Sequence, residues 1–311
     1  MNLKDVVAIG AALVDMVALI ENFPGIDEEV FVPKLELMGG GSAANFAIAC
    51  ARLGLITGFI GKLGRDAFGN KLLDDFKEEK VIIDGIVFSP EIPTGVCYAV
   101  VDKNGNRILY AFSGAANVLE PEDLDGNFIK SFRVIHLASL KNLRPFIRAA
   151  ELVQEEHTRV CLNPGALIVE QGLAKVEPLL KLTDIFIGSQ GEVKRLFQTD
   201  NLAKGIRSLL KYMEIVVITQ GGEGSLVATE EGEINIPAEK VKVVDTTGAG
   251  DAFSAGFIYG LLKYNFNPYK LEFCGKLGNL AAASCIQRVG ARQGLLTESQ
   301  MDQYLKELTS Q

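Results

Sequence analysis

The sequence predicts an α/β fold, in which a central, mostly parallel sheet is joined to a second, smaller β-sheet. From about residue 132 onward, short apolar segments rich in β-branched residues alternate with helical segments, which is typical of a buried parallel sheet. Strand-like segments in the first third of the chain instead form a separate group. No internal repeat or Pro-rich linker divides the chain, so residues 1–311 are predicted to form a single domain.

The first third is predicted to contain one core strand, four strands of the smaller sheet and one helix. The helix covers Ser42–Leu53, with Ser42 as its N-cap and apolar residues at helical spacing. Lys103–Asn106 reads KNGN, a strong hairpin-turn signal. The predicted strands are Val6–Gly10 in the core and, within residues 12–38 and 95–113 of the smaller sheet, Asp15–Ile20, Val30–Leu37, Val96–Asp102 and Arg107–Phe112.

The remainder is predicted to complete the central sheet and to end in helices. Ser225–Thr229 and Glu233–Ile236 resemble a meander, Val241–Val244 is expected to return to the sheet, and Gly275–Ile286 is helical and rich in small residues. The predicted buried parallel strands are Val134–Leu137, Val160–Leu162, Asp184–Ile187 and Ile215–Thr219.

Composition excludes several classes of function. The net charge is −8 and there is no basic run, which argues against a nucleic-acid partner. The five cysteines are scattered and there are only two histidines, so a zinc site is not expected and the thiols are typical of a reducing compartment. Polar residues interrupt both long apolar segments (residues 6–20 and 41–61), which argues against a membrane span. A cytoplasmic protein is therefore expected.

The most informative segment is Val241–Phe257, VKVVDTTGAGDAFSAGF. Its order is that of a strand, a glycine turn and a helix N-terminus, where backbone N–H groups and the helix dipole favour an anion. A carboxylate beside a site that only binds phosphate would be unfavourable, because like charges repel. It is explained if Asp251 takes a proton from a hydroxyl that attacks the phosphoryl group. The alternative is that Asp251 only caps the helix. The glycine nest before it favours the catalytic interpretation.

Two common nucleotide-binding motifs are missing. No glycine run is followed by Lys and Ser or Thr, as a P-loop requires, and the glycines after Val6–Gly10 do not have the dinucleotide-binding spacing. The phosphates must be held in another way, and a dinucleotide-dependent dehydrogenase is disfavoured.

Two motifs resemble the signatures of the PfkB (ribokinase-like) carbohydrate kinase family. The first is GGGSAANFA at Gly39–Ala47 with ARLG at Ala51–Gly54, and the second is DTTGAGDAF at Asp245–Phe253. Gly61–Gly69 and Thr219–Gly224 are also similar to family patterns. The resemblance covers essentially the whole chain. It implies a ribokinase-like three-layer α/β/α fold with a small β-sheet lid, and transfer of the ATP γ-phosphoryl group to a hydroxymethyl group.

The resemblance assigns the catalytic and acceptor-binding residues. Asp251 matches the catalytic base, and the amides of Gly248, Ala249 and Gly250 match an anion hole. Acceptor hydroxyls would be held by a further set of residues, whose carboxylate, amide and exposed backbone suit vicinal hydroxyls. The members of this set are Asp15, Gly40, Gly41 and Asn45. The alternative for Asp15 is an exposed strand residue.

The resemblance also places ATP and its cations. The segment Thr219–Gly224 has the pattern T-x-G-x-x-G, which is more often an ordinary turn than a nucleotide site. Its assignment to ATP binding therefore depends on the other motifs. The family's N-x-x-E element, whose Glu places Mg²⁺ through water, has Ser189 in place of Asn and retains Glu192. Asp245 and Thr247 match a monovalent-cation (K⁺) site. The nucleotide-binding positions are Ser189, Thr219, Gly221, Gly224, Asn279 and Ala282.

The lid suggests a homodimer, and three functions remain open. Apolar lid residues either pack within the lid or pair with a second copy, and the set considered is Val17, Leu19, Val30, Val32 and Val100. The first hypothesis is an ATP-dependent sugar kinase. The second is a nucleoside kinase, because Ser42-Ala43 replaces the Lys of the ribokinase motif and leaves room for a larger acceptor. The third is a ligand-binding regulator without catalysis, against which the intact Gly248–Asp251 motif argues. The sequence does not select the acceptor.

Overall fold

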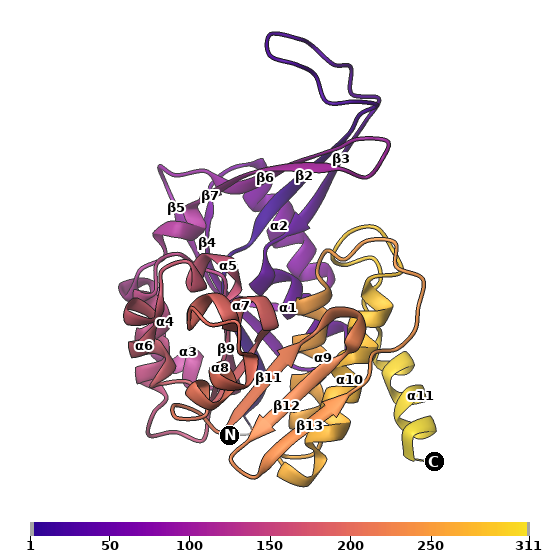
Figure 1. The fold of residues 1–311 in the computed structure, drawn as a ribbon. Helices are drawn as coiled ribbons and strands as arrows, with labels where there is room; N and C mark the ends of the chain where they lie inside the picture. The colour runs from indigo at the N-terminus through magenta and orange to yellow at the C-terminus, as the bar shows by residue number, and fades with distance from the viewer. Residues whose placement is uncertain (1–2, 310–311) are drawn as a thin grey trace.

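The computed structural model describes residues 3–309 and contains a nine-stranded central sheet. Seven neighbouring strands are parallel, and the last two at one edge are joined to them and to each other by antiparallel pairing. This confirms the predicted mostly parallel sheet (Figure 1). The order across the sheet is β13 (Gly232–Ile236), β12 (Ser225–Thr229), β11 (Ile215–Thr219), β10 (Ile185–Ser189), β9 (Arg159–Asn163), β8 (Phe132–Ala138), β1 (Lys4–Gly10), β4 (Thr57–Gly64) and β5 (Ile82–Ser89).

Helices cover both faces of this sheet, because its strands carry apolar side chains on both sides. Alternate residues of β1 show the division: Val6 and Ala8 belong to one buried cluster, and Val7 and Ile9 to the other. The first face is covered by α1 (Ser42–Arg52), α2 (Ala67–Glu78), α9 (Ala249–Lys263), α10 (Leu271–Cys285) and α11 (Glu298–Thr309). The second is covered by α3 (Gly126–Lys130), α4 (Arg144–Leu152), α5 (Gly165–Val169), α6 (Leu173–Leu180), α7 (Gln190–Leu196) and α8 (Leu202–Leu209).

One sequence expectation fails here, and two strands of the sheet were missed. The strands β4 and β5 were not predicted, since three glycines in TGFIGKLG weaken the strand pattern and the segment follows an apolar helix almost directly. Val241–Val244 does not return to the sheet: it is an irregular crossing to α9, in which Val243 and Val244 are 56% and 51% exposed. The β-branched run predicts a strand, but the Val244 N–H donates to the Ile286 carbonyl oxygen at the end of α10 and not to a strand of the sheet.

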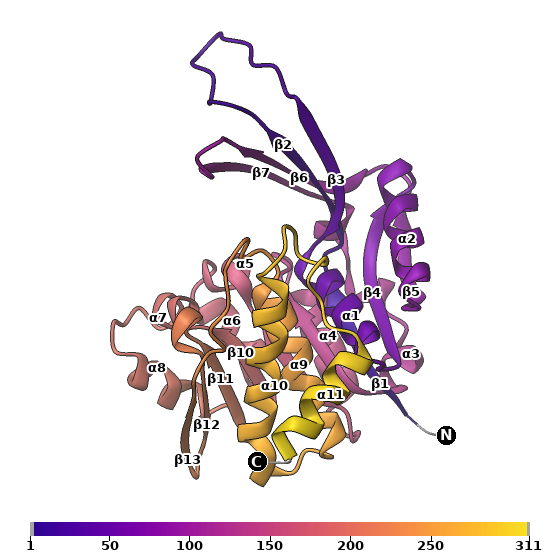
Figure 2. The same ribbon diagram turned by 90° about the vertical axis from the view of Figure 1, so that its right-hand side faces the viewer.

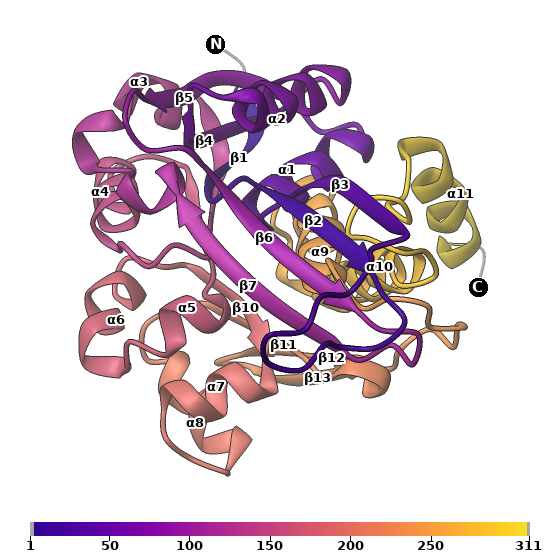
Figure 3. The same ribbon diagram turned by 90° about the horizontal axis from the view of Figure 1, so that it is seen from above.

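Four other strands form the predicted second sheet, in the order β3 (Lys34–Gly40), β2 (Leu13–Leu19), β6 (Thr94–Val101) and β7 (Arg107–Gly114). This sheet, called the lid below, stands above the carboxyl ends of the parallel strands (Figures 2 and 3). The prediction that a strand begins at Val30 is wrong, because residues 30–33 belong to the loop before β3. Pro33 lacks the N–H group that a ladder there would need.

The register gives the lid two different faces. Asp15 is aligned with Met38 on β3 and Cys97 on β6, so these three side chains lie on one face. That face looks toward the main body, because Met38 accepts a hydrogen bond from Gln293. The opposite face carries six exposed large apolar residues: Leu35, Leu37, Tyr98, Ile108, Tyr110 and Phe112.

Within residues 3–309, no helix is both long enough and apolar enough to span a bilayer.

Candidate active site

The carboxylate of Asp251 lies at the start of α9, where it faces the start of α1. Its Oδ1 accepts a hydrogen bond from Ser42 Oγ at 2.5 Å, and its Oδ2 accepts one from Asn45 Nδ2 at 3.0 Å. Burial raises the pKa of Asp251 to about 6, although the two hydrogen bonds and the charge of Arg292 lower it. The two signature motifs, more than 200 residues apart in sequence, therefore meet at one carboxylate.

Asp15 supplies a second carboxylate from the lid. Burial raises the pKa of Asp15 to about 6, with Arg292 opposing it, and Asp15 in turn raises the pKa of Asp251. A Cβ on Gly40 would overlap the Asp15 carboxylate, so the close approach of β2 and β3 at the lid's base requires glycine there. Asp15, Gly40 and Asn45 are thus gathered around Asp251, as a shared acceptor site would need.

The start of α1 differs from the prediction that Ser42 is an N-cap. Gly41 is the N-cap residue, with φ 94°, and Ser42 is the first helical residue. The Ser42 hydroxyl bonds to Asp251 instead of capping its own helix. The N-cap expectation was wrong because the positive φ at the helix start falls to Gly41, which places Ser42 inside the helix.

A cavity of about 680 Å³ opens beside the N-terminus of α9. Its walls come from the end of β11, the segment after β13, and α10, and a Cβ on Gly250 would meet nothing within 4 Å. Asn279 is held in place by donating to the carbonyl oxygens of Ile236 and Pro237. The predicted nucleotide residues that line the cavity are Thr219, Gly221, Gly224, Asn279 and Ala282, together with Ala249 and Gly250 of the predicted anion hole. The space and the free backbone suit a nucleotide.

Gly248 precedes the helix in a left-handed conformation, with φ 78°. Asp245 organises the turn before it: Oδ1 accepts from the backbone N–H and the hydroxyl of Thr247, and Oδ2 accepts from Gly290 N–H at 2.8 Å. Burial opposes ionisation of this carboxyl, but the hydrogen bonds from Gly290 and Thr247 prevail and lower the pKa of Asp245. The predicted cation residues thus also form a loop that joins Gly248 to the segment after α10.

Ser189 and Glu192 form a capping box at the start of α7. Ser189 Oγ accepts from Glu192 N–H at 3.2 Å, and Glu192 Oε2 accepts from Ser189 N–H at 2.8 Å. Ser189 is also the register partner of Thr219 on the neighbouring strand. With Ser in place of Asn, Glu192 thus remains fixed beside the end of β11, which borders the 680 Å³ cavity.

Arg292 was not identified from the sequence. It lies in the segment after α10, is 9% exposed, and donates to Asn45 Oδ1 from Nε at 2.9 Å. A lone Arg between small residues gives no local signal, because its partner is 247 residues away. Only the fold brings it to the site.

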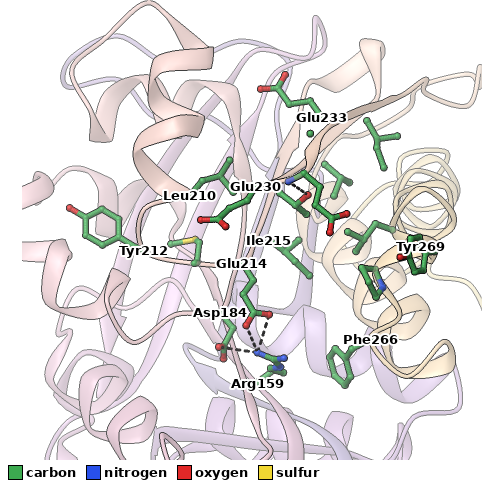
Figure 4. Close-up of a pocket in the computed structure, with 18 of the residues that line it drawn as sticks. Arg159, Asp184, Leu210, Tyr212, Glu214, Ile215, Glu230, Glu233, Phe266 and Tyr269 are labelled. Carbon is green, nitrogen blue, oxygen red and sulfur yellow. Dashed lines mark hydrogen bonds and ion pairs between the residues drawn. The ribbon is translucent and has the colours of Figure 1, made fainter.

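A larger cavity, of about 1090 Å³, lies at the opposite end of the strands, where β9 and β11 begin (Figure 4). Arg159 lines this cavity and is paired with Asp184 and Glu214 at 3.3 and 3.1 Å. None of the predicted site residues lines it. In open α/β sheets, ligands bind at the carboxyl ends of the strands, so the smaller cavity is the better candidate despite its size.

A nucleotide-sized cavity, a nest of amides at a helix N-terminus and two facing carboxylates are the features of a small-molecule kinase. The model of the pfkB family carbohydrate kinases matches residues 3–298, and the chain belongs to that family. It is an ATP-dependent phosphotransferase whose acceptor is a sugar or a nucleoside.

Individual relatives cover most of the chain. An uncharacterised sugar kinase of Archaeoglobus fulgidus is 38% identical over 247 residues, which are 79% of this chain and 97% of that protein. A nucleoside kinase of Methanothermobacter thermautotrophicus is 26% identical over 94% of this chain and 92% of its own length. The structure of Arabidopsis thaliana ribokinase complexed with ribose and ATP superposes with a TM-score of 0.86 at 24% identity, over 98% and 99% of the two chains. This likeness confirms the predicted ribokinase-like fold.

Proposed function

We propose that this enzyme transfers the ATP γ-phosphoryl group to a hydroxymethyl group of a sugar, with Asp251 as the general base. The observation that carries the proposal is the half-buried Asp251 carboxylate, which two side chains of α1 hold at the N-terminus of α9. With a pKa near 6, this carboxyl is ionised at neutral pH and remains basic enough to accept a hydroxyl proton.

The amides at Gly248, Ala249 and Gly250 are proposed to hold the transferred phosphoryl group. They lie at the start of α9, where the helix dipole attracts negative charge, although the Ala249 N–H also donates to the Thr246 carbonyl oxygen at 3.2 Å. ATP supplies the phosphoryl group, and the 680 Å³ cavity has open space at Gly250 for it. Glu192 is proposed to orient Mg²⁺ through water, and its fixed position in the capping box suits that role.

A monovalent cation, K⁺, is proposed at the Asp245–Thr247 turn. The carboxylate is held ionised by its hydrogen bonds, and oxygen ligands suit an alkali cation. Such an ion would stabilise the turn that positions Gly248. Turnover in K⁺ compared with a bulky organic cation at equal ionic strength tests this: equal rates would remove the ion from the proposal.

A sugar is proposed as the acceptor, with a nucleoside as the alternative. Asp15 accepts no hydrogen bond within the described residues 3–309, which leaves its oxygens free for vicinal hydroxyls. The lid face around it carries mostly small or apolar side chains, such as Cys97, Ala99 and Ala111. The same face suits a nucleoside base, and only the acceptor screen below separates the two.

The chain is proposed to act as one cytoplasmic unit whose lid closes over the acceptor and excludes water. The apolar lid residues considered for pairing with a second copy do not all lie on one face of the lid. The strand register places Val17 and Leu19 on the inner face and Val100 on the outer face. A homodimer is therefore proposed through the outer face, where Tyr98, Tyr110 and their neighbours are exposed. Light scattering should give twice the 33.6 kDa chain mass, and a monomeric mass at working concentration would exclude it.

The proposed reaction is tested by a phosphoryl-transfer screen. Pentoses, hexoses, phosphorylated sugars and nucleosides are offered with ATP, GTP or ADP, and phosphorylated product is detected by mass spectrometry. We expect a neutral sugar with ATP to react best. Preferred turnover of a nucleoside would replace the sugar assignment. Binding of an acceptor without any product would favour the non-catalytic regulator.

A further inference from the structure

Arg292 links four separate parts of the chain at the base of the lid. Its Nε donates to Asn45 Oδ1 at 2.9 Å, one terminal nitrogen donates to the Gly40 carbonyl oxygen at 3.3 Å, and the other pairs with Asp75 at 3.2 Å. The three partners come from α1, β3 and α2. A guanidinium can make all three bonds at once because its donors form a rigid planar fork.

The bond to Asn45 determines which way its amide points. Because Oδ1 of Asn45 accepts from Arg292, Nδ2 must point the other way, toward Asp251 Oδ2 at 3.0 Å. A neutral amide without this partner has two orientations that differ by a half turn, and one of them would place its oxygen against the carboxylate. Arg292 is therefore two hydrogen bonds from the proposed base.

The neighbouring backbone is shaped around this arginine. A Cβ on Gly39 would overlap both the Arg292 guanidinium and the Asp75 carboxylate, so the strand leaves this space to the ion pair. On its far side, Arg52 donates to the Arg292 carbonyl oxygen and forms a two-nitrogen pair with Glu79. The side chain is thus fixed from several directions, as precise positioning needs.

We propose that Arg292 is a positioning residue for phosphoryl transfer, which acts through Asn45 on Asp251 and ties that contact to the lid base at Gly40. The proposal rests on the proposed role of Asp251 as base. Arg292 touches neither carboxylate oxygen of Asp251. Its charge lowers the pKa of Asp251 from a distance, and its proposed contribution beyond that charge is to hold the amide that contacts the carboxylate.

A double-mutant cycle on turnover tests the linkage. Arg292→Met and Asn45→Ala are each expected to lower kcat by about 10- to 100-fold, because a misplaced reacting group has effects of this size. If Arg292 acts through Asn45, the double variant should lose no more than about threefold beyond the worse single variant. Losses that multiply would overturn the proposal. The KM for ATP should change less than about threefold, since Arg292 does not line the nucleotide cavity.

Two further variants separate positioning from general destabilisation. Arg292→Lys keeps the charge but loses the fork, so it should recover less than a tenth of the lost kcat; full recovery would show that charge alone is needed. Arg159→Met is the matched control, because Arg159 pairs with the carboxylates of Asp184 and Glu214, as Arg292 pairs with Asp75, but lies at the opposite end of the strands. It should lower the melting temperature and leave kcat within twofold.

A readout without turnover keeps this proposal distinct from the proposed function. The side-chain amide signals of Asn45 in ¹⁵N-labelled enzyme, assigned by their loss in Asn45→Ala, report its two hydrogen bonds. We expect Arg292→Met to shift them and to speed their hydrogen exchange at least tenfold, and Arg159→Met to leave them unchanged. If Asp251→Asn remains active, the base assignment fails even when this result holds. If the Asn45 signals do not respond to Arg292→Met, the positioning proposal fails on its own.

Discussion

Ser42 Oγ donates a hydrogen bond of 2.5 Å to Asp251 Oδ1 across 209 residues of sequence. One residue comes from the glycine-rich start of α1 and the other from the glycine-rich start of α9. The contact therefore joins the two signature motifs directly. It lowers the pKa of Asp251, in opposition to the burial that raises it.

Replacing Ser42 by Ala should shift the pH dependence of the reaction. Loss of the hydroxyl removes a bond that favours the ionised carboxylate, so the pKa of Asp251 should rise above about 6. The acid limb of kcat/KM should then move to higher pH, with a several-fold larger loss at pH 6 than at pH 8. Initial rates across pH 5–9 measure this. The partly exposed Ser208→Ala on α8 serves as control, and an unmoved acid limb in Ser42→Ala would contradict the assignment.

Asp251→Asn should lower kcat by about three orders of magnitude or more, because an amide cannot accept the hydroxyl proton. Acceptor affinity should change little, since the amide has nearly the same shape and Asp15 remains in place. Single-turnover kinetics and calorimetric binding of the acceptor measure the two quantities. Near wild-type turnover in this variant would remove Asp251 from the base role.

The same variant should be more stable than the wild type at alkaline pH. The folded pKa of Asp251 is about 6, above the value of about 3.9 for an unfolded chain, so the native state binds its proton more tightly. This contribution to stability is fully present below pH 4 and is lost as the pH rises through 6. The neutral amide of Asp251→Asn carries no such penalty, so the variant should gain roughly 1–3 kcal/mol at pH 8, and less toward pH 4. Urea unfolding at both pH values tests this, and an equal difference at both would refute it.

The sequence was most informative where a local pattern determines the structure. The apolar runs of β8 to β11 were found because a parallel strand buried on both faces is continuously apolar. Part of the lining of the 680 Å³ cavity could also be named in advance, because Thr219–Gly224 and Ala249–Gly250 lie in recognisable glycine-rich segments. Both signals are contained within a few consecutive residues.

The features that the sequence did not predict depend on contacts between residues that are far apart in the sequence. Val241–Val244 has the composition of a strand, but the Val244 N–H donates to the Ile286 carbonyl oxygen at the end of α10 and not to a strand. Ser42 is a residue type that often caps helices, yet its hydroxyl donates a hydrogen bond to Asp251. Arg292 has three partners in three different elements and none near it in sequence. Such residues are recognised only when the fold brings their partners together.

Two glycines of the same turn should respond oppositely to alanine. Gly248 has φ 78°, and a Cβ there would overlap Ala291, so Gly248→Ala should destabilise the fold by about 1–3 kcal/mol. Gly250 lies inside α9 with open space around it, so Gly250→Ala should be neutral or stabilising by up to about 1 kcal/mol. The added methyl would nevertheless enter the nucleotide cavity and raise the KM for ATP several-fold. Thermal unfolding and ATP titrations measure both, and a stable, fully active Gly248→Ala would contradict the argument.

His136 makes the fold sensitive to acid for a reason unrelated to catalysis. Its ring is fully buried on β8 and stacks on Phe46, with centroids 3.6 Å apart. Neither ring nitrogen has a hydrogen-bond partner within residues 3–309, and burial lowers the pKa of His136 from 6.5 to about 3. The unfolded chain therefore binds a proton at pH 5 that the native state does not, and stability falls as the pH drops below 6.5.

His136→Leu should remove this acid sensitivity while keeping the side-chain volume nearly unchanged. Relative to the wild type, the variant should gain about 2 kcal/mol between pH 8 and pH 5, because 1.5 pH units below an unfolded pKa of about 6.5 correspond to that free energy. The gain runs opposite to that of Asp251→Asn, which grows as the pH rises. The exposed His157→Gln is the matched control for loss of an imidazole. Urea unfolding across pH 5–8 measures the difference, and parallel stability curves for His136→Leu and the wild type would show that the buried ring does not cause the acid lability.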